Sequence, residues 1–174
     1  MTTRAGDGGD TSLFGPGRVR KTDARIEALG DLDEAQAVLG VARAEAGGGV
    51  ADLILEFQRG LYIAMSEVAT PAARLARLPQ RVDAVAVATL EERLAALKAT
   101  TAIEGVFVVP GEDRLSAALD LARVVVRRAE RRVVGLADAG LVEGAQLVPW
   151  LNRLSDAIYV LARSVERSRR VARA

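Results

Sequence analysis

The sequence contains no cysteine and no histidine, and only two of its 24 basic residues are lysines, Lys21 and Lys98. Without cysteine, the chain can form no disulfide, no thiolate metal site and no cysteine nucleophile. Without histidine, it can form no Ser-His-Asp triad, no histidine general base and no His-ligated zinc or haem site. Any chemistry must therefore use carboxylates, guanidinium groups, hydroxyls, or a bound metal or cofactor.

An excess of charge of one sign and long apolar runs are also missing. The 24 basic residues against 23 acidic ones give a net charge of +1, which offers no overall electrostatic reason to expect nucleic acid or a membrane as partner. No apolar stretch approaches the roughly 20 residues that span a bilayer, and the opening MTTRAGDGGDTS has no hydrophobic signal core. We therefore expect a cytoplasmic protein that binds neither nucleic acid nor membrane.

What the sequence does contain favours one helical domain over residues 1–174. The length of 174 residues and a hydrophobic content of 50% suit a single domain with a sizeable core. Residues 1–22 have little periodicity and many glycines, and they predict an irregular arm. Residues 23–174 predict an all-α, five-helix bundle.

The helices are expected from apolar spacing and from their end signals. The first begins after Asp23 as N-cap and stops at Gly47, and the second ends near Thr70 because Pro71 follows. The others are predicted over residues 82–99, 114–137 and from 145 to near the C-terminus. The fifth carries apolar residues that alternate by four and three, the pattern of a helix packed in a bundle: Leu147, Leu151, Leu154, Ile158, Leu161 and Val165.

Two segments outside this helical pattern matter for function. The stretch GVFVVPG at residues 105–111 is β-branched and closed by a turn signal, so it is expected to be extended. The arm combines glycines, hydroxyls and cations, which would let backbone N–H groups and Lys21 surround a polyphosphate. A Walker A loop is excluded because no Gly-Lys pair exists. On composition alone, a disordered tail is the commoner explanation of such an arm.

The predicted fourth helix carries a row of arginines. Arg123, Arg127 and Arg131 are four residues apart, so they share one helical face, with Glu130 beside it. A solvated charged face is the simple interpretation. Because the row lies next to the apolar seam of the same helix, a ligand or partner subunit that covers it is the alternative.

Two further polar groups leave similar alternatives open. On the fifth helix, Asn152, Asp156, Tyr159 and Arg163 share a face opposite the leucine seam, which predicts a polar strip that is either exposed or interfacial. Asp33 lies in the middle of the first helix and could pair with an arginine of the fourth across an interface. Mid-helix acids are usually exposed, so this pairing is weakly indicated by itself.

Six segments taken in order resemble the PduO-type ATP:cob(I)alamin adenosyltransferases, also called corrinoid adenosyltransferases. They cover nearly the whole chain: TRAGDGGDTSLFGPGRVRK (3–21), DARIEALGDLDEAQAVLG (23–40), EVATP (67–71), FVVPG (107–111), LARVVVRRAERRVV (121–134) and LNRLSD (151–156). The resemblance implies a homotrimer of five-helix bundles with active sites between subunits. It also implies transfer of the 5′-deoxyadenosyl group from ATP to the cobalt of cob(I)alamin, which releases tripolyphosphate.

The resemblance also implies roles for individual residues. Mg²⁺ would sit on phosphate oxygens and water, without metal ligands from the protein. Phe107 would press on the lower face of the corrin, although core packing is the simpler explanation without the family match. Asp33 and Arg123 would form an intersubunit salt bridge that shapes the pocket. The ATP site would comprise Thr3, Arg4, Ala5, Gly6, Thr11, Ser12, Lys21, Arg127, Arg128, Glu130, Arg131 and Asn152.

The chain departs from the family pattern at Ala5, Gln36 and Glu112, and its basic ending SVERSRRVARA lacks aromatic residues. We expect that ending to be a frayed helix end. A corrinoid carrier or ATP-responsive module without turnover is the alternative function. A purely structural bundle would leave the glycine arm unexplained. The enzyme would further need a reductase for the cobalt and an adenosylcobalamin-dependent enzyme to accept the product.

Overall fold

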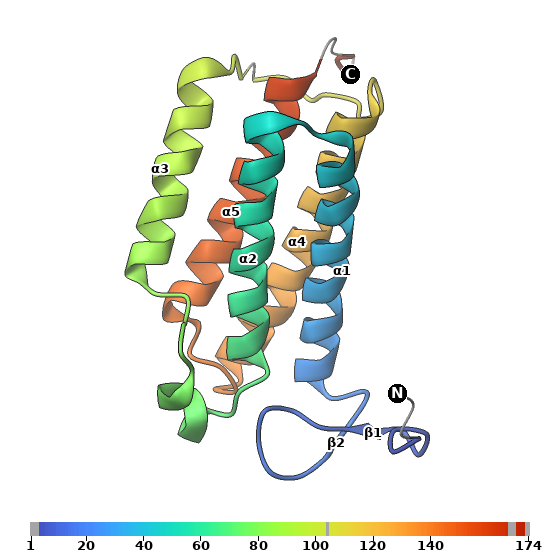
Figure 1. Ribbon diagram of the computed structural model, residues 1–174, viewed down its shortest axis with the longest axis vertical. Coiled ribbons are helices and arrows are strands. Elements are labelled where there is room, and N and C mark those ends of the chain that lie inside the picture. Colours follow the sequence, from blue (N-terminus) through green and yellow to red (C-terminus); the bar gives the residue numbers. More distant parts are fainter. Residues whose placement is uncertain (1–3, 104, 167–169, 173–174) are drawn as a thin grey trace.

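Five long helices form the body of the computed structural model, which describes residues 4–103, 105–166 and 170–172. Figure 1 shows them side by side along the long axis of the molecule. They are α1 (Ala24–Glu45), α2 (Gly48–Val68), α3 (Ala84–Thr100), α4 (Arg114–Asp138) and α5 (Gly144–Val165). A short 3₁₀ helix, η1 (Ala72–Arg77), follows α2. The predicted all-α five-helix bundle is confirmed.

The helices begin and end close to the predicted residues because local signals fix them. Asp23, Asp83 and Asp113 cap α1, α3 and α4, and each side chain accepts a hydrogen bond from a backbone N–H two or three residues later, at 2.8–2.9 Å. Helix α1 ends at Glu45, just before the glycines at 47–49, and α2 begins within these glycines at Gly48.

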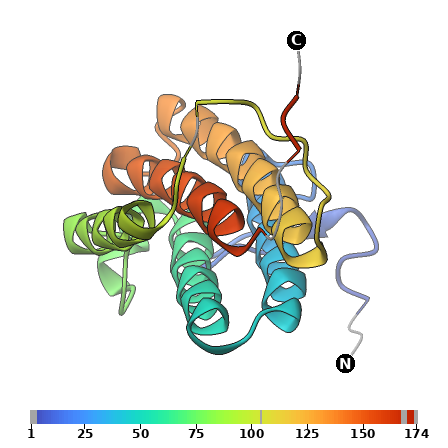
Figure 2. The same ribbon diagram turned by 90° about the horizontal axis from the view of Figure 1, so that it is seen from above.

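The bundle core is made by the apolar stripes of four packed helix pairs. α1 packs on α4 and on α2, while α5 packs on α4 and on α3. Figure 2 shows this arrangement from above. The predicted α5 seam is buried from Leu147 to Leu161. The Trp150 ring of α5 lies directly against the α2 backbone at Gly60, where an added Cβ would be 2.2 Å from Trp150 Cζ2.

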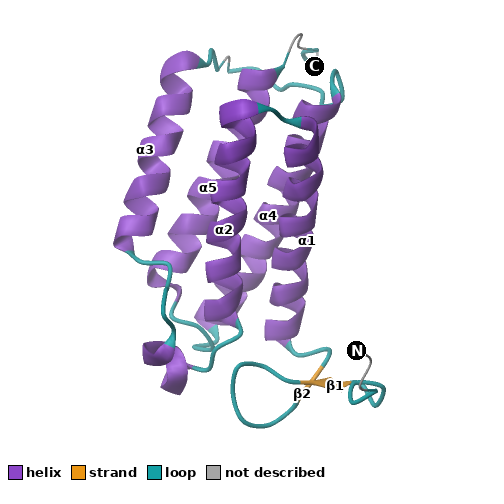
Figure 3. Cartoon of the chain, viewed as in Figure 1, coloured by secondary structure: helices purple, strands orange, loops and turns teal. Residues whose placement is uncertain are grey.

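The arm is more ordered than the sequence predicted. It contains a two-residue antiparallel ladder between β1 (Asp10–Thr11) and β2 (Val19–Arg20), which appears in orange in Figure 3. The side chains of Arg18 and Arg20 tie it together by donating to the backbone carbonyls of Asp10 and Gly8, at 2.8 and 3.1 Å. Such short strands leave no periodic signal in a sequence.

The expectation of a frayed helix at the C-terminus is wrong for the described tail residues. Helix α5 ends at Val165, and residues 170–172 run extended beside the segment that follows α3. Val109 N–H donates to the carbonyl of Arg170, and Ala172 N–H donates to that of Phe107, both at 2.8 Å. The extended conformation predicted for residues 105–111 is thus stabilised by a partner from the far end of the chain.

No helix within the described part of the chain has the length and apolar character needed to cross a membrane.

Candidate functional site

In the arm, the amino group of Lys21 lies beside the backbone at Gly6. A Cβ added at Gly6 would lie 3.3 Å from Lys21 Nζ, so the ammonium group rests against the arm backbone. The Lys21 N–H donates to the carbonyl of Gly9 at 2.9 Å, and Gly9 has a φ of +84° that favours glycine. Among the expected arm residues, Arg4, Ala5, Gly6, Thr11 and Ser12 are described, whereas Thr3 lies outside the described residues.

The arginines of α4 divide between two faces. Arg127 and Arg131 are exposed to solvent and are linked by a hydrogen bond from Arg131 Nη1 to the Arg127 carbonyl at 3.0 Å. Arg128 points toward α1, where its Nε donates to Asp31 Oδ1 at 3.0 Å and its Nη2 to Glu34. Desolvation lowers the pKa of Arg128, but hydrogen bonds and Coulombic attraction to these acids outweigh it and leave the pKa raised.

Arg132 joins the same α1 face as Arg128, with ion pairs to Glu27 at 3.5 Å and to Asp31 at 3.6 Å. The acids that meet α4 within one chain were not identified from the sequence, and Asp33, which was singled out there, is exposed. An acidic row at residues 27, 31 and 34, spaced by four and then three positions, was the available signal. It could not tell which turn of α1 faces α4.

Two residues predicted for the nucleotide site are in contact between α4 and α5. Asn152 Nδ2 donates to Glu130 Oε1 at 3.0 Å. The Asn152 carbonyl oxygen Oδ1 accepts from Arg153 Nη1 at 2.9 Å, and Arg153 in turn pairs with Glu91 of α3 at 2.9 Å. The amide is therefore held in one orientation by a partner on each side.

Phe107 is 87% exposed, so it is not a core residue. It lies on the extended segment after α3 and lines a hollow of about 390 Å³ together with Arg123, Tyr159 and Arg163. Arg123 and Arg163 lie over the Tyr159 ring, 5.8 and 5.2 Å from its centroid.

A buried ion pair supports the floor of this hollow. Arg163 Nη2 donates to Asp120 Oδ2, and both side chains are almost fully buried. Arg163 also pairs with Glu166 at 2.7 Å, and Arg123 Nε lies 3.8 Å from Asp120. The polar strip expected on α5 is thus buried at Arg163 and exposed at Asp156.

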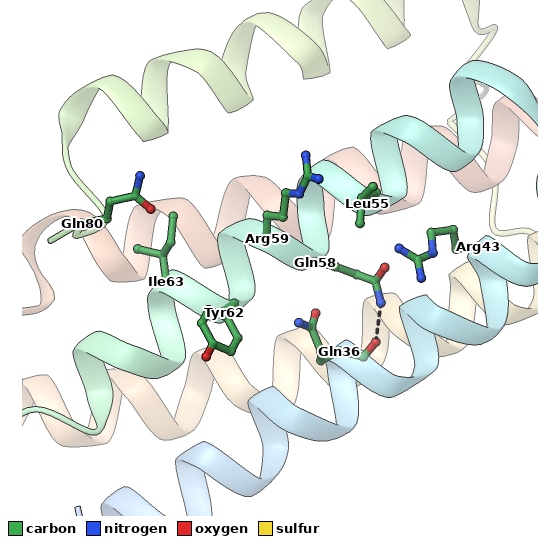
Figure 4. Close-up of a pocket in the computed structure, with 8 residues that line it drawn as sticks. All are labelled: Gln36, Arg43, Leu55, Gln58, Arg59, Tyr62, Ile63 and Gln80. Carbon is green, nitrogen blue, oxygen red and sulfur yellow. Dashed lines mark hydrogen bonds between the residues drawn. The ribbon is translucent and has the colours of Figure 1, made fainter. Parts of the chain in front are cut away.

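A separate groove opens between α1 and α2 (Figure 4). Its volume is about 510 Å³, and Gln58 Nε2 donates across it to the backbone carbonyl of Gln36 at 3.0 Å. Of the residues that depart from the family pattern, Gln36 lies here. The groove is lined by Gln36, Arg43, Leu55, Gln58, Arg59, Tyr62, Ile63 and Gln80, so none of the residues expected to bind ATP or corrin line it.

The predicted site residues of one chain do not converge on a single point. The arm lies below the bundle in Figure 1, and the segment with Phe107 lies above it. Helix α4 alone has 25 residues, and a helix of that length extends about 37 Å. Across the described ranges, no three acidic side chains gather into a cluster that could hold a metal ion.

Comparisons with known proteins agree on one family. Residues 1–165 match the family described as cobalamin adenosyltransferase. A corrinoid adenosyltransferase of Citrobacter freundii is 37% identical over 129 residues, which cover 72% of each chain. One from Mycobacterium tuberculosis is 39% identical over 130 residues, covering 73% of this chain and 67% of that one.

Solved structures extend the similarity to the fold. A variant of the PduO-type ATP:corrinoid adenosyltransferase from Lactobacillus reuteri, complexed with cobalamin and ATP, superposes with a TM-score of 0.89 at 26% identity and covers 99% of both chains. Another variant of the Lactobacillus reuteri enzyme, complexed with ATP, gives a TM-score of 0.88 at 26% identity, covering 99% of this chain and 100% of that one.

Proposed function

Because this chain belongs to the cobalamin adenosyltransferase family, we propose that it transfers the 5′-deoxyadenosyl group of ATP to the cobalt of a reduced corrinoid. The cobalt(I) centre of the substrate attacks C5′ of ATP. A cobalt–carbon bond forms, the C5′–O bond breaks, and its electron pair leaves with tripolyphosphate. No proton has to be removed from the nucleophile, so a chain without histidine or cysteine can carry out the reaction.

The protein's part is to place C5′ in line with cobalt and to stabilise the charge that builds on the leaving group. The arm is suited to the second task, since it places the exposed Lys21 ammonium beside the backbone at Gly6. We assign the triphosphate to the arm residues Thr3, Arg4, Ala5, Gly6, Thr11, Ser12 and Lys21.

The remaining nucleotide contacts are assigned to α4 and α5. Arg127 and Arg131 are exposed guanidinium groups, which we assign to the same leaving triphosphate. The fixed Glu130–Asn152 pair offers a carboxylate and an amide for the sugar and base. Arg128 was predicted to join them. Its hydrogen bonds to Asp31 and Glu34 favour a supporting role, in which it fixes α4 against α1.

At the other end of the bundle, Phe107 is assigned to the lower face of the corrin. An exposed ring on an extended segment can meet a planar macrocycle without disturbing the core. By keeping an axial ligand off cobalt, it would make the metal easier to reduce. Arg123, half-buried beside this hollow, is assigned to a salt bridge with Asp33 of a neighbouring subunit.

The distance between the arm and Phe107 supports a site shared between subunits. If both groups act in one reaction, the arm must come from one chain and Phe107 from another, because the length of the bundle separates them within a chain. The family resemblance implies that three chains take part, and we propose a closed homotrimer with three such sites.

Mg²⁺ is proposed to accompany ATP, held mainly by phosphate oxygens and water. The arm carboxylate of Asp10 is already paired with Arg20 at 3.1 Å, which fits a metal carried by the nucleotide. When bound, Mg²⁺ would supply positive charge to the departing triphosphate. A cytoplasmic location, a supplying reductase and an accepting adenosylcobalamin-dependent enzyme are further expectations of this function.

The family match over residues 1–165 is the observation that carries this function. An anaerobic assay with chemically reduced cobalamin, ATP and Mg²⁺ tests it by following the spectral change to adenosylcobalamin. Product that depends on both ATP and protein is expected. ATP binding without product would instead favour the corrinoid carrier.

A further inference from the structure

We propose that Glu67 is a positioning residue for the arm: its buried carboxylate fixes the turn that follows α2, and this turn holds the arm in place. Through it, Glu67 would set the affinity for ATP, an inference that rests on the proposed role of the arm as the triphosphate site.

The carboxylate of Glu67 stands where a charge is unfavourable. Its side chain is buried, with 2% exposure, in the last turn of α2. Desolvation and the negative end of the helix dipole both disfavour it there. The charge is accommodated because Oε1 accepts from Arg81 Nη2 at 3.1 Å and Oε2 accepts from the Val82 N–H at 3.0 Å.

Arg81 extends this contact to a third element. Its Nη2 also donates to Glu143 Oε2 at 2.9 Å, and Glu143 is the residue directly before α5. The hydrogen bond to Glu143, followed by that to Glu67, raises the pKa of Arg81 above its ordinary value. The clamp formed by Glu67, Arg81 and Glu143 therefore joins the end of α2, the loop before α3 and the start of α5.

The arm docks on the turn that this clamp fixes. The Phe14 N–H donates to the Ala69 carbonyl at 2.9 Å, two residues after Glu67. The next arm residue lies against the same turn, since a Cβ added at Gly15 would be 2.9 Å from Pro71 Cγ. The backbone of the turn is tied to Glu67 itself, because Thr70 N–H donates to the Glu67 carbonyl at 3.1 Å.

These contacts form one continuous path from the clamp to the nucleotide site. Phe14 and Gly15 lie in the loop between β1 and β2, the two strands that lead to Thr11 and Lys21. A shift of the turn at residues 69–71 would move this loop and change where the hydroxyls and the ammonium group meet the phosphates. The extended segment that follows α3 and carries Phe107 lies at the opposite end of the bundle (Figure 1), so the corrin side should not respond.

The variant Glu67→Gln tests the path because it keeps the size of the side chain and removes the charge that holds Arg81. We expect KM for ATP to rise about tenfold, the effect of one lost charge-assisted hydrogen bond. The KM for the corrinoid should stay unchanged, whereas kcat should fall, because the arm is assigned to the charge that builds on the leaving triphosphate. Glu56→Gln is the matched control, because Glu56 also lies on α2 and pairs with an arginine, Arg93, at 3.2 Å, but on an exposed face away from the arm.

Hydrogen exchange at the Phe14 amide gives a second readout that needs no activity. Without ATP, this amide should exchange faster in Glu67→Gln than in the wild type or in Glu56→Gln. If the wild type transfers no adenosyl group, the proposed function fails. Faster Phe14 exchange in Glu67→Gln would then still support the proposal that Glu67 positions the arm.

Unchanged Phe14 exchange together with unchanged KM for ATP would overturn the proposal. Equal fold increases in KM for ATP and KM for the corrinoid, together with a fall in kcat, would also overturn it. That pattern indicates a general structural role for Glu67. If Glu67→Gln does not fold, Gly15→Ala tests the same contact from the arm side. It should raise KM for ATP selectively, and a Gly15→Ala protein with wild-type kinetics would contradict the proposal.

Discussion

At the scale of single residues, the arginines of α4 separate into two groups with different expected roles. Arg127 is exposed and assigned to the leaving triphosphate, whereas Arg132 pairs with Glu27 and Asp31 of the same chain. Arg127→Ala should lower turnover about 10²-fold or more, as the loss of a charge-stabilising donor does. Arg132→Ala should keep turnover, because its exposed ion pairs contribute about 0–1 kcal/mol each to stability.

Anaerobic kinetics on both variants, with sedimentation to confirm assembly, measures this difference. Full turnover by an assembled Arg127→Ala protein would rule out the assigned role.

Phe107 and Phe57 offer a second contrast between two residues of the same type. Phe107 is 87% exposed and Phe57 is 1% exposed. Phe107→Ala should leave the free energy of unfolding unchanged and reduce adenosyl transfer. Phe57→Ala should lower the free energy of unfolding by about 3–5 kcal/mol, because it leaves a cavity in the core. Chemical denaturation and the transfer assay, run on both, separate the two effects; a destabilised Phe107→Ala protein would mean that Phe107 is a packing residue after all.

Part of the candidate site was predictable residue by residue, and part depended on the rotation of helices about their axes. Spacing placed Arg127 and Arg131 on one face, and the structure shows both exposed. Spacing could not show that Arg128 turns toward Asp31 and Glu34. The helical period shows which residues share a face of α4, but it does not show which face packs against α1. The burial of Asp120 with Arg163 escaped prediction for the same reason, since the two are 43 positions apart.

At the scale of elements, the helices were predictable because their end signals are local. Aspartate caps start α1, α3 and α4, and Pro71 follows the end of α2. The hairpin of the arm and the pairing of Val108 with Val171 were not predictable. Both are short, and both depend on contacts between segments rather than on a repeating pattern.

Two helical glycines test how closely the helices pack. A Cβ at Gly60 would lie 2.2 Å from the Trp150 ring, whereas one at the exposed Gly135 would meet nothing within 4 Å. Gly60→Ala should lower the free energy of unfolding by about 1–3 kcal/mol, because the added methyl group overpacks against the Trp150 ring. Gly135→Ala should raise the free energy of unfolding by up to about 1 kcal/mol, because alanine has the higher helix propensity. Thermal unfolding of the two variants checks the signs, and equal shifts would contradict the close contact between the Trp150 ring and Gly60.

At the scale of the whole molecule, the separation of the arm from Phe107 predicts complementation between chains. Lys21→Ala and Phe107→Ala chains should each transfer the adenosyl group poorly when assembled alone. In randomly mixed trimers, about one quarter of the sites should combine an intact arm with an intact Phe107, if each site is built from two neighbouring subunits. Activity after the two variants are unfolded and refolded together measures this fraction; no recovery would argue that each chain builds its own site.

The central claim is that this chain makes the bond between cobalt and C5′ of ATP. Its most direct test is an anaerobic reaction with ATP labelled with ¹³C at C5′, reduced cobalamin and Mg²⁺, analysed for both products. We predict labelled adenosylcobalamin and an equal amount of tripolyphosphate, with neither formed when the protein is omitted. Bound ATP with unlabelled, unmodified cobalamin and no tripolyphosphate would contradict the account.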